Sequence, residues 1–124
     1  MSESVLVVDD ERIMVEIVTE FITSISAADK IDQCSNGKDA LKMCLTQKYK
    51  LILLDYMMAS MNGGEFVISL RRGSSINKET PIIFVTANEE QAKPYTENFS
   101  NVIMINKPIH LKKFTDALNF FFKK

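Results

Sequence analysis

Polar residues follow four short apolar runs in this chain, and their types suit the chemistry of one phosphate group. Asp9 and Asp10 come directly after the run that begins at residue 5, and Asp55 follows a second apolar run. Thr86 and Lys107 follow the last two runs. Because ligands of open α/β sheets bind at the carboxyl ends of the strands, we expect these side chains to converge at one edge of a sheet.

This set of residue types indicates metal-assisted phosphoryl chemistry. Clustered carboxylates repel one another and need a cation, and oxygen ligands with several waters suit Mg²⁺. The metal would offset the charge of a phosphoryl group, Lys107 would add a second positive charge, and Thr86 would add a hydroxyl donor. The role that remains for Asp55 is that of a nucleophile that forms an aspartyl-phosphate.

Each of these residues also has an ordinary structural interpretation. Asp9 or Asp10 before a helix is more often an N-cap, and Asp55 equally fits a turn. Thr86 alone is typical of a strand, and Lys107 alone is typical of a solvated charge. The functional prediction therefore depends on their joint occurrence at four strand ends.

The apolar pattern predicts five strands and five helices in strict alternation. We expect strands at residues 5–8, 30–35, 51–54, 82–85 and 102–105, and helices at 11–27, 38–47, 65–72, 89–99 and 111–122. Pro94 favours a break in the fourth helix. Right-handed crossovers between parallel strands place helices on both faces of the sheet. The prediction is an α/β fold of (βα)5 order, with a five-stranded parallel sheet in one domain spanning residues 1–124.

Composition excludes several classes of protein. A net charge of -1 gives no electrostatic signature of nucleic-acid or anionic-membrane binding, and no apolar stretch approaches the ~20 residues of a membrane span. Cys34 and Cys44 lack the spacing of metal ligands. We expect a cytoplasmic protein with reduced thiols and neither a nucleic-acid nor a membrane partner. Met1 favours a true N-terminus, whereas nothing marks the end at Lys124.

The whole chain resembles a response-regulator receiver domain, the fold of the single-domain chemotaxis regulators of two-component systems. The matching residues are Val7-Val8-Asp9-Asp10-Glu11, Asn36-Gly37, Leu53-Leu54-Asp55, Met58, Met61, Gly63, Thr86-Ala87 and Lys107-Pro108. The resemblance implies the flavodoxin-like receiver fold and Mg²⁺ as the cofactor. It also implies a donor, which is a phosphohistidine on a sensor histidine kinase or a histidine phosphotransfer protein.

The resemblance further implies the metal ligands. It makes Asp10 a direct Mg²⁺ ligand and lets Asp9 act mainly through water. Asp55 and the backbone carbonyl of Met57 would complete the protein ligands.

By the same resemblance, Asp55 is the phosphoacceptor, Thr86 is the switch hydroxyl that moves onto the phosphoryl group, and Lys107 pairs with that group. The Lys107–Pro108 peptide bond corresponds to one that is usually cis in the family. These three residues would therefore perform the chemistry of the module.

Two positions depart from the family pattern, and two others are variable in the family. Ala59 stands where the family usually has Pro. Met104 stands at the position of the switch aromatic, and a thioether cannot copy an aromatic ring whose rotamer follows the switch Thr. Met57 and Asn88 occupy the two variable positions that flank the phosphoryl group. We hypothesise that the bulky Met57 side chain shields the acyl phosphate from water and gives it a long lifetime.

The last helix offers a candidate output residue. We expect Leu111, Phe114, Leu118 and Phe121 to face the core, with Phe120 pointing away from them. A single exposed aromatic is common, but one that is rimmed by charged residues also marks interfaces. Phe120 is therefore either an isolated exposed ring or a contact for a downstream protein partner or a phosphorylation-dependent dimer.

The leading hypothesis is a phosphoacceptor signalling module that is not an enzyme in the usual sense. Phosphorylation of Asp55 would switch partner binding through the fourth helix, fifth strand and fifth helix. A pseudo-receiver that binds partners without phosphorylation is the alternative that Met104 keeps open. Met57 argues against a dehalogenase-like phosphatase, which has a second Asp there. The acidic run at residues 9–11 argues against a flavodoxin-like cofactor binder, because it would repel phosphate without a metal.

Overall fold

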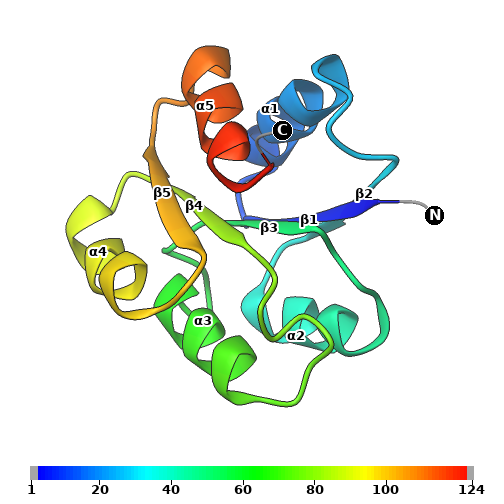
Figure 1. Ribbon diagram of the computed structural model, residues 1–124. Helices are drawn as coiled ribbons and strands as arrows, with labels where there is room; N and C mark the ends of the chain where they lie inside the picture. Colours follow the sequence, from blue (N-terminus) through cyan, green and yellow to red (C-terminus); the bar gives the residue numbers. More distant parts are fainter. Residues whose placement is uncertain (1–2, 123–124) are drawn as a thin grey trace.

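The computed structural model describes residues 3–122, which form a five-stranded parallel sheet flanked by helices (Figure 1). The strands lie in the order β2-β1-β3-β4-β5. The strands are β1 (Ser4–Val8), β2 (Lys30–Cys34), β3 (Leu51–Leu54), β4 (Ile82–Thr86) and β5 (Val102–Asn106). The helices are α1 (Arg12–Ser24), α2 (Gly37–Thr46), α3 (Gly63–Arg72), α4 (Glu89–Asn98) and α5 (Leu111–Phe122). The predicted (βα)5 fold is confirmed.

Met1 and Lys124, at which we expected the N-terminus and the end of the domain, lie outside the described residues. None of the helices in residues 3–122 is long and apolar enough to cross a membrane.

Helices cover both faces of the sheet and create two apolar cores. Figure 1 shows α1 and α5 on one face, and α2, α3 and α4 on the other. Alternate strand residues point to opposite faces, so Leu6 and Phe84 join the core under α2, α3 and α4, while Val7 and Ile83 join the core under α1 and α5. Burial on both faces explains why the strands read as continuous apolar runs.

A capping box fixes the start of α3 close to the third strand. The Asn62 side chain accepts a hydrogen bond from the Glu65 backbone N–H, and the Glu65 carboxylate accepts one from the Asn62 N–H. The helix therefore starts at Gly63, two residues before the predicted position. A Cβ at Gly63 would lie 2.6 Å from the ring of Phe84, so only glycine lets the chain after Asp55 approach β4 this closely.

Three local predictions were wrong. Neither Asp9 nor Asp10 caps α1, because the Asp9 carboxylate accepts from the Glu11 N–H in a short turn before the helix. The N-cap residue is Glu11, and its side chain makes no capping hydrogen bond. Pro94 does not break α4, because the carbonyl that loses its partner belongs to the solvent-exposed Glu90, where water can replace the missing donor. Leu111 is exposed because it starts α5, ahead of the turns that pack on the sheet.

Asn77 joins three segments at the amino end of the sheet. Its side-chain amide donates to the carbonyls of Cys44 and Gln47 at 2.8 and 2.7 Å. Its side-chain oxygen accepts from the Tyr49 N–H at 2.8 Å and from the Thr80 hydroxyl at 2.9 Å. Asn77 is 0% exposed, and its bonds to Cys44, Tyr49 and Thr80 are buried. The end of α2, the start of β3 and the start of β4 are thereby held together.

We expect Asn77→Ala to lower the free energy of unfolding by about 3 kcal/mol, because it leaves several buried donors and acceptors without partners. Chemical denaturation checks this. Asn98→Ala removes an exposed amide that donates only to the Pro94 carbonyl, and it should change stability by less than about 0.5 kcal/mol. Equal effects of the two substitutions would contradict the role given to Asn77.

Candidate functional site

The sheet brings the residues predicted at the strand ends to one edge. Asp9 follows β1, Asp55 follows β3, and Thr86 is the last residue of β4. The Asp9 and Asp55 carboxyl groups lie side by side because Val8 of β1 pairs with Leu54 of β3. The Asp55 N–H also donates to the Val8 carbonyl at 3.0 Å. All three residues are buried, at 6%, 5% and 0% exposure respectively.

Lys107 reaches this cluster from the end of β5. Its backbone N–H donates to the Thr86 carbonyl at 3.0 Å, which fixes the start of the side chain. Its Nζ lies 2.9 Å from a carboxylate oxygen of Glu11, 3.4 Å from Asp55 and 3.6 Å from Asp9. Burial lowers the pKa of Lys107, but the hydrogen bond to Glu11 and the charges of Asp55 and Asp9 outweigh it and raise the pKa above its usual value.

Three carboxylates in this cluster could share one cation. Asp9, Glu11 and Asp55 each offer an oxygen, and these oxygens lie within 4.8 Å of one another. Carboxylate oxygens are hard ligands, which suit Mg²⁺ better than a soft metal. The donor set therefore fits the predicted magnesium site. Sequence reasoning gave Glu11 no role in it, although a third acidic residue directly after Asp9 and Asp10 was the available signal.

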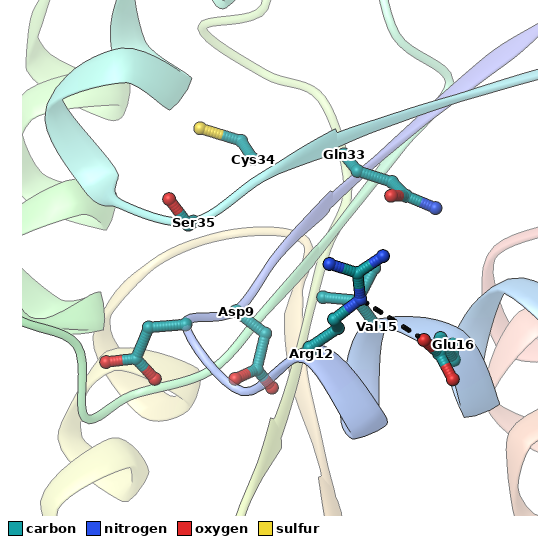
Figure 2. Close-up of a pocket in the computed structure, with 8 residues that line it drawn as sticks. Asp9, Arg12, Val15, Glu16, Gln33, Cys34 and Ser35 are labelled. Carbon is teal, nitrogen blue, oxygen red and sulfur yellow. Dashed lines mark hydrogen bonds and ion pairs between the residues drawn. The ribbon is translucent and has the colours of Figure 1, made fainter.

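Asp10 lies outside this group of three. Its side chain is exposed, and together with Asp9 it lines a neighbouring groove of about 570 Å³ between the start of α1 and the end of β2. Figure 2 shows the groove, with Arg12 paired to Glu16 on the α1 side. Direct ligation of a metal by Asp10 and by the backbone carbonyl of Met57 stays a prediction.

The buried position of Asp9 is unfavourable for its charge. Desolvation is the largest cause, and the negative charge of Asp55 adds to it; together they raise the pKa of Asp9 to about 6. The Glu11 N–H and the Lys107 ammonium act in the opposite direction without cancelling these effects. The pocket therefore carries an excess of negative charge that a bound cation would relieve.

Thr86 keeps its hydroxyl engaged in the loop that follows β4. The hydroxyl oxygen accepts a hydrogen bond from the Asn88 N–H at 3.0 Å. Met57, two residues after Asp55, is 55% exposed, so its side chain lies at the surface beside the pocket. The Lys107–Pro108 peptide bond is cis, as expected.

An aromatic contact that sequence reasoning missed links the pocket to α4. Tyr56, directly after Asp55, lies with its ring centre 6.1 Å from that of Tyr95 on α4. The Tyr95 ring rests on the bare backbone of Gly64 in α3. Burial and then the interaction with Tyr95 raise the pKa of Tyr56. Met104 is half-buried against the same core.

The part of the predicted output surface that lies between β5 and α5 is exposed to solvent. Phe120 is 71% exposed and lines a groove of about 420 Å³ between β5 and α5, as predicted from its position on the helix. Phe114 and Leu118 are buried, and Phe121 is half-buried, so the inward face of α5 is confirmed apart from Leu111.

Asp9→Asn should stabilise the protein in metal-free buffer near neutral pH. Between pH 3.8 and about 6 the folded wild type binds more protons than the unfolded chain, so its unfolding free energy falls as pH rises. We expect a gain on the order of 2 kcal/mol for the variant at pH 7, which disappears below about pH 4. Denaturation at several pH values measures it.

The matched control is Asp116→Asn, which neutralises an exposed carboxylate whose ion pair within residues 3–122 is with Lys112. It should change stability by less than about 0.5 kcal/mol at any of these pH values. A gain for Asp9→Asn that does not depend on pH would contradict the assigned cause.

Comparisons with known proteins identify the family of this chain. The sequence profile of the response regulator receiver domain matches residues 5–119. The transcriptional regulatory protein SrrA of Staphylococcus aureus is 34% identical over 91 residues, which cover 73% of this chain and 35% of that protein. This chain thus spans about a third of the length of the curated relatives it matches.

Solved structures share the fold. The chemotaxis response regulator CheY4 of Vibrio cholerae superposes with a TM-score of 0.83 at 24% identity, covering 98% of this chain and 100% of that chain. The receiver domain of the sensor histidine kinase PA1611 of Pseudomonas aeruginosa, solved with a magnesium ion in its active site cleft, gives a TM-score of 0.82 at 19% identity, with 98% of both chains covered. By the profile match over residues 5–119, the chain belongs to the response regulator receiver domain family of two-component signalling.

Proposed function

We propose that this receiver accepts a phosphoryl group on Asp55 from a phosphohistidine of a sensor histidine kinase or a histidine phosphotransfer protein. The observation that carries the proposal is the buried Asp55 carboxylate, which shares a cation-binding cluster with Asp9 and has the Lys107 ammonium 3.4 Å away. A nucleophile, a metal site and a fixed positive charge thus meet at one position, which is the arrangement that phosphoryl transfer needs.

The transfer is a displacement at phosphorus. An Asp55 carboxylate oxygen forms the new O–P bond as the N–P bond of the donor breaks, and the electron pair of that bond returns to the imidazole. The imidazole is protonated on its other nitrogen and leaves as a neutral group. Bound Mg²⁺ supplies positive charge for the phosphoryl oxygens, and the PA1611 structure with its magnesium ion supports Mg²⁺ as the cofactor here.

Lys107 and Thr86 act on the phosphoryl group after transfer. The Lys107 ammonium already lies in the pocket and pairs with a phosphoryl oxygen. The Thr86 hydroxyl can rotate from the Asn88 N–H towards the same group, because it is bound by only one strong hydrogen bond in the loop. Asp10 and the Met57 carbonyl serve as further metal ligands in this proposal.

The output is a change of partner binding. New contacts of Thr86 and Lys107 alter the ends of β4 and β5, and these strands carry α4 and α5. Met104 and the exposed Phe120 lie on that surface and form the contact for a downstream protein partner or a dimer. The matched residues cover about a third of SrrA, so transcriptional regulation is a property of that whole protein and is not part of this proposal. One domain over residues 1–124 and a cytoplasmic location complete the proposal.

A pseudo-receiver is the second candidate, and Met104 is the observation that favours it. A thioether at the β5 switch position offers no ring whose rotamer would follow Thr86. In this form the surface around Phe120 would bind its partner in one state only, whether or not Asp55 is modified.

Intact-protein mass decides between the two candidates. After incubation with Mg²⁺ and acetyl phosphate, the wild type should gain one phosphoryl group, and it should gain none without Mg²⁺ or with Asp55→Ala. Asp116→Asn, a control that removes an exposed carboxylate paired with Lys112 on α5, should be labelled like the wild type. Labelling by a kinase or acetyl phosphate that survives in Asp55→Ala would contradict the proposed acceptor, and a lack of labelling with any phosphohistidine donor would favour the pseudo-receiver.

Met57→Ala should shorten the lifetime of the phosphoryl group, because the smaller side chain leaves the acyl phosphate more open to water. We expect hydrolysis to be about threefold faster, which corresponds to ~0.7 kcal/mol of barrier. The decay of the phosphorylated mass with time measures this. Ile76→Ala truncates a similarly exposed side chain at the other end of the sheet and should leave the lifetime unchanged. Equal decay of Met57→Ala and wild type would reject the shielding role.

A further inference from the structure

The Lys107 ammonium lies among the same three carboxylates that could share a metal ion. Its Nζ contacts Glu11 at 2.9 Å, Asp55 at 3.4 Å and Asp9 at 3.6 Å. The oxygens of these three residues form the candidate cation cluster. The ammonium and a divalent cation therefore compete for the same carboxylates, and a cation that binds the oxygens facing Lys107 displaces the ammonium.

The three partners of Lys107 differ in their access to solvent. The side chains of Asp9 and Asp55 are 6% and 7% exposed, whereas that of Glu11 is 62% exposed. The two inner carboxylates are poorly hydrated, so they gain most from a small doubly charged ion. The outer carboxylate lies on the side towards which a repelled ammonium can retreat, and it already makes the shortest contact.

The backbones on both sides of this outer pair are fixed. The Glu11 N–H donates to Asp9 at 2.9 Å, which ties the start of α1 to the pocket. The Lys107 N–H donates to the Thr86 carbonyl at 3.0 Å, which ties the other partner to the end of β4. Only the two side chains need to rearrange for Lys107 to exchange three partners for one.

We infer that Glu11 is a positioning residue that receives the Lys107 ammonium when a divalent cation occupies the Asp9 and Asp55 oxygens. It thereby lowers the cost of displacing Lys107 from Asp55 and holds the ammonium at Glu11, from which it can reach a phosphoryl group on Asp55. The role of Lys107 towards a phosphoryl group rests on the proposed function, whereas the displacement of Lys107 by a cation concerns metal binding alone. Glu11 acts through Lys107 in this inference and is not a metal ligand.

A double-mutant cycle on Mg²⁺ affinity tests this without any phosphodonor. Isothermal titration calorimetry with MgCl₂ compares the wild type, Glu11→Gln, Lys107→Gln and the double variant. Lys107→Gln should tighten Mg²⁺ binding, because it removes the competing cation. Glu11→Gln should weaken binding about three- to fivefold in the wild-type background, as expected for loss of one well-placed ion pair. In the Lys107→Gln background, at least half of this effect should disappear.

The charge-matched control is Glu16→Gln. Glu16 lies on the first turns of α1, its side chain is 64% exposed, and its ion pair is with Arg12. It changes the net charge as Glu11→Gln does but has no contact with Lys107, and its effect on Mg²⁺ affinity should be small because exposed charges are screened. Equal weakening by Glu11→Gln in both backgrounds, or equal weakening by Glu16→Gln, would overturn the inference.

Phosphorylation provides an independent readout. With acetyl phosphate, Glu11→Gln should need more Mg²⁺ for half-maximal labelling than the wild type. An unchanged Mg²⁺ requirement would overturn the inference. If no variant is labelled by any donor, the proposed function fails, but the calorimetric cycle still decides the role of Glu11. A wild type that binds no Mg²⁺ would overturn both.

A crystal structure of the wild type with Mg²⁺ covers the case in which Lys107→Gln does not fold. The inference requires Lys107 Nζ to contact Glu11 and to have left Asp9 and Asp55. A Glu11 oxygen at about 2.1 Å from the ion, the distance of a direct ligand, would overturn it.

Discussion

Two buried carboxylates at adjacent strand ends, with one ammonium between them, govern this edge of the molecule. β1 and β3 are neighbours in the middle of the sheet, so Asp9 and Asp55 are placed together by the same pairing that builds the core. Their like charges oppose folding, and Lys107 offsets only part of that opposition. Affinity for a further positive charge therefore follows from the fold itself and needs no dedicated loop.

The sequence predicted the parts of the site that depend on strand ends. Asp9, Asp55, Thr86 and Lys107 were found because apolar runs mark buried parallel strands, and the carboxyl ends of such strands share one edge. Glu11 was missed because a single residue after the strand reads equally well as the first position of a helix. Its contact with Lys107 spans 96 positions, and no local pattern carries that information.

Side chains packed behind the pocket were also beyond the reach of periodicity. Tyr56 follows Asp55 directly, yet its contact with Tyr95 depends on how α4 lies against α3. Glycine at position 64 makes the contact geometrically possible, because the ring occupies the space of the missing Cβ. The two tyrosines connect the residue after Asp55 to α4, and Met104 packs against the same core. Sequence patterns predict which face of a helix is apolar, but they do not predict which rings meet.

The network around Asn77 gives the two ends of the sheet different physical characters. The interior of the amino end is held by the neutral hydrogen bonds of the buried Asn77, which respond little to ionic strength, while charged contacts of Lys48, Lys50 and Arg71 lie nearer the surface. The carboxyl end is held by ions, which respond to salt and to added charge. Amides near Asn77 should therefore exchange with deuterium only through global unfolding, whereas those at the strand tips open locally at lower free energy. The protein can reorganise the charged end repeatedly while the sheet itself remains closed.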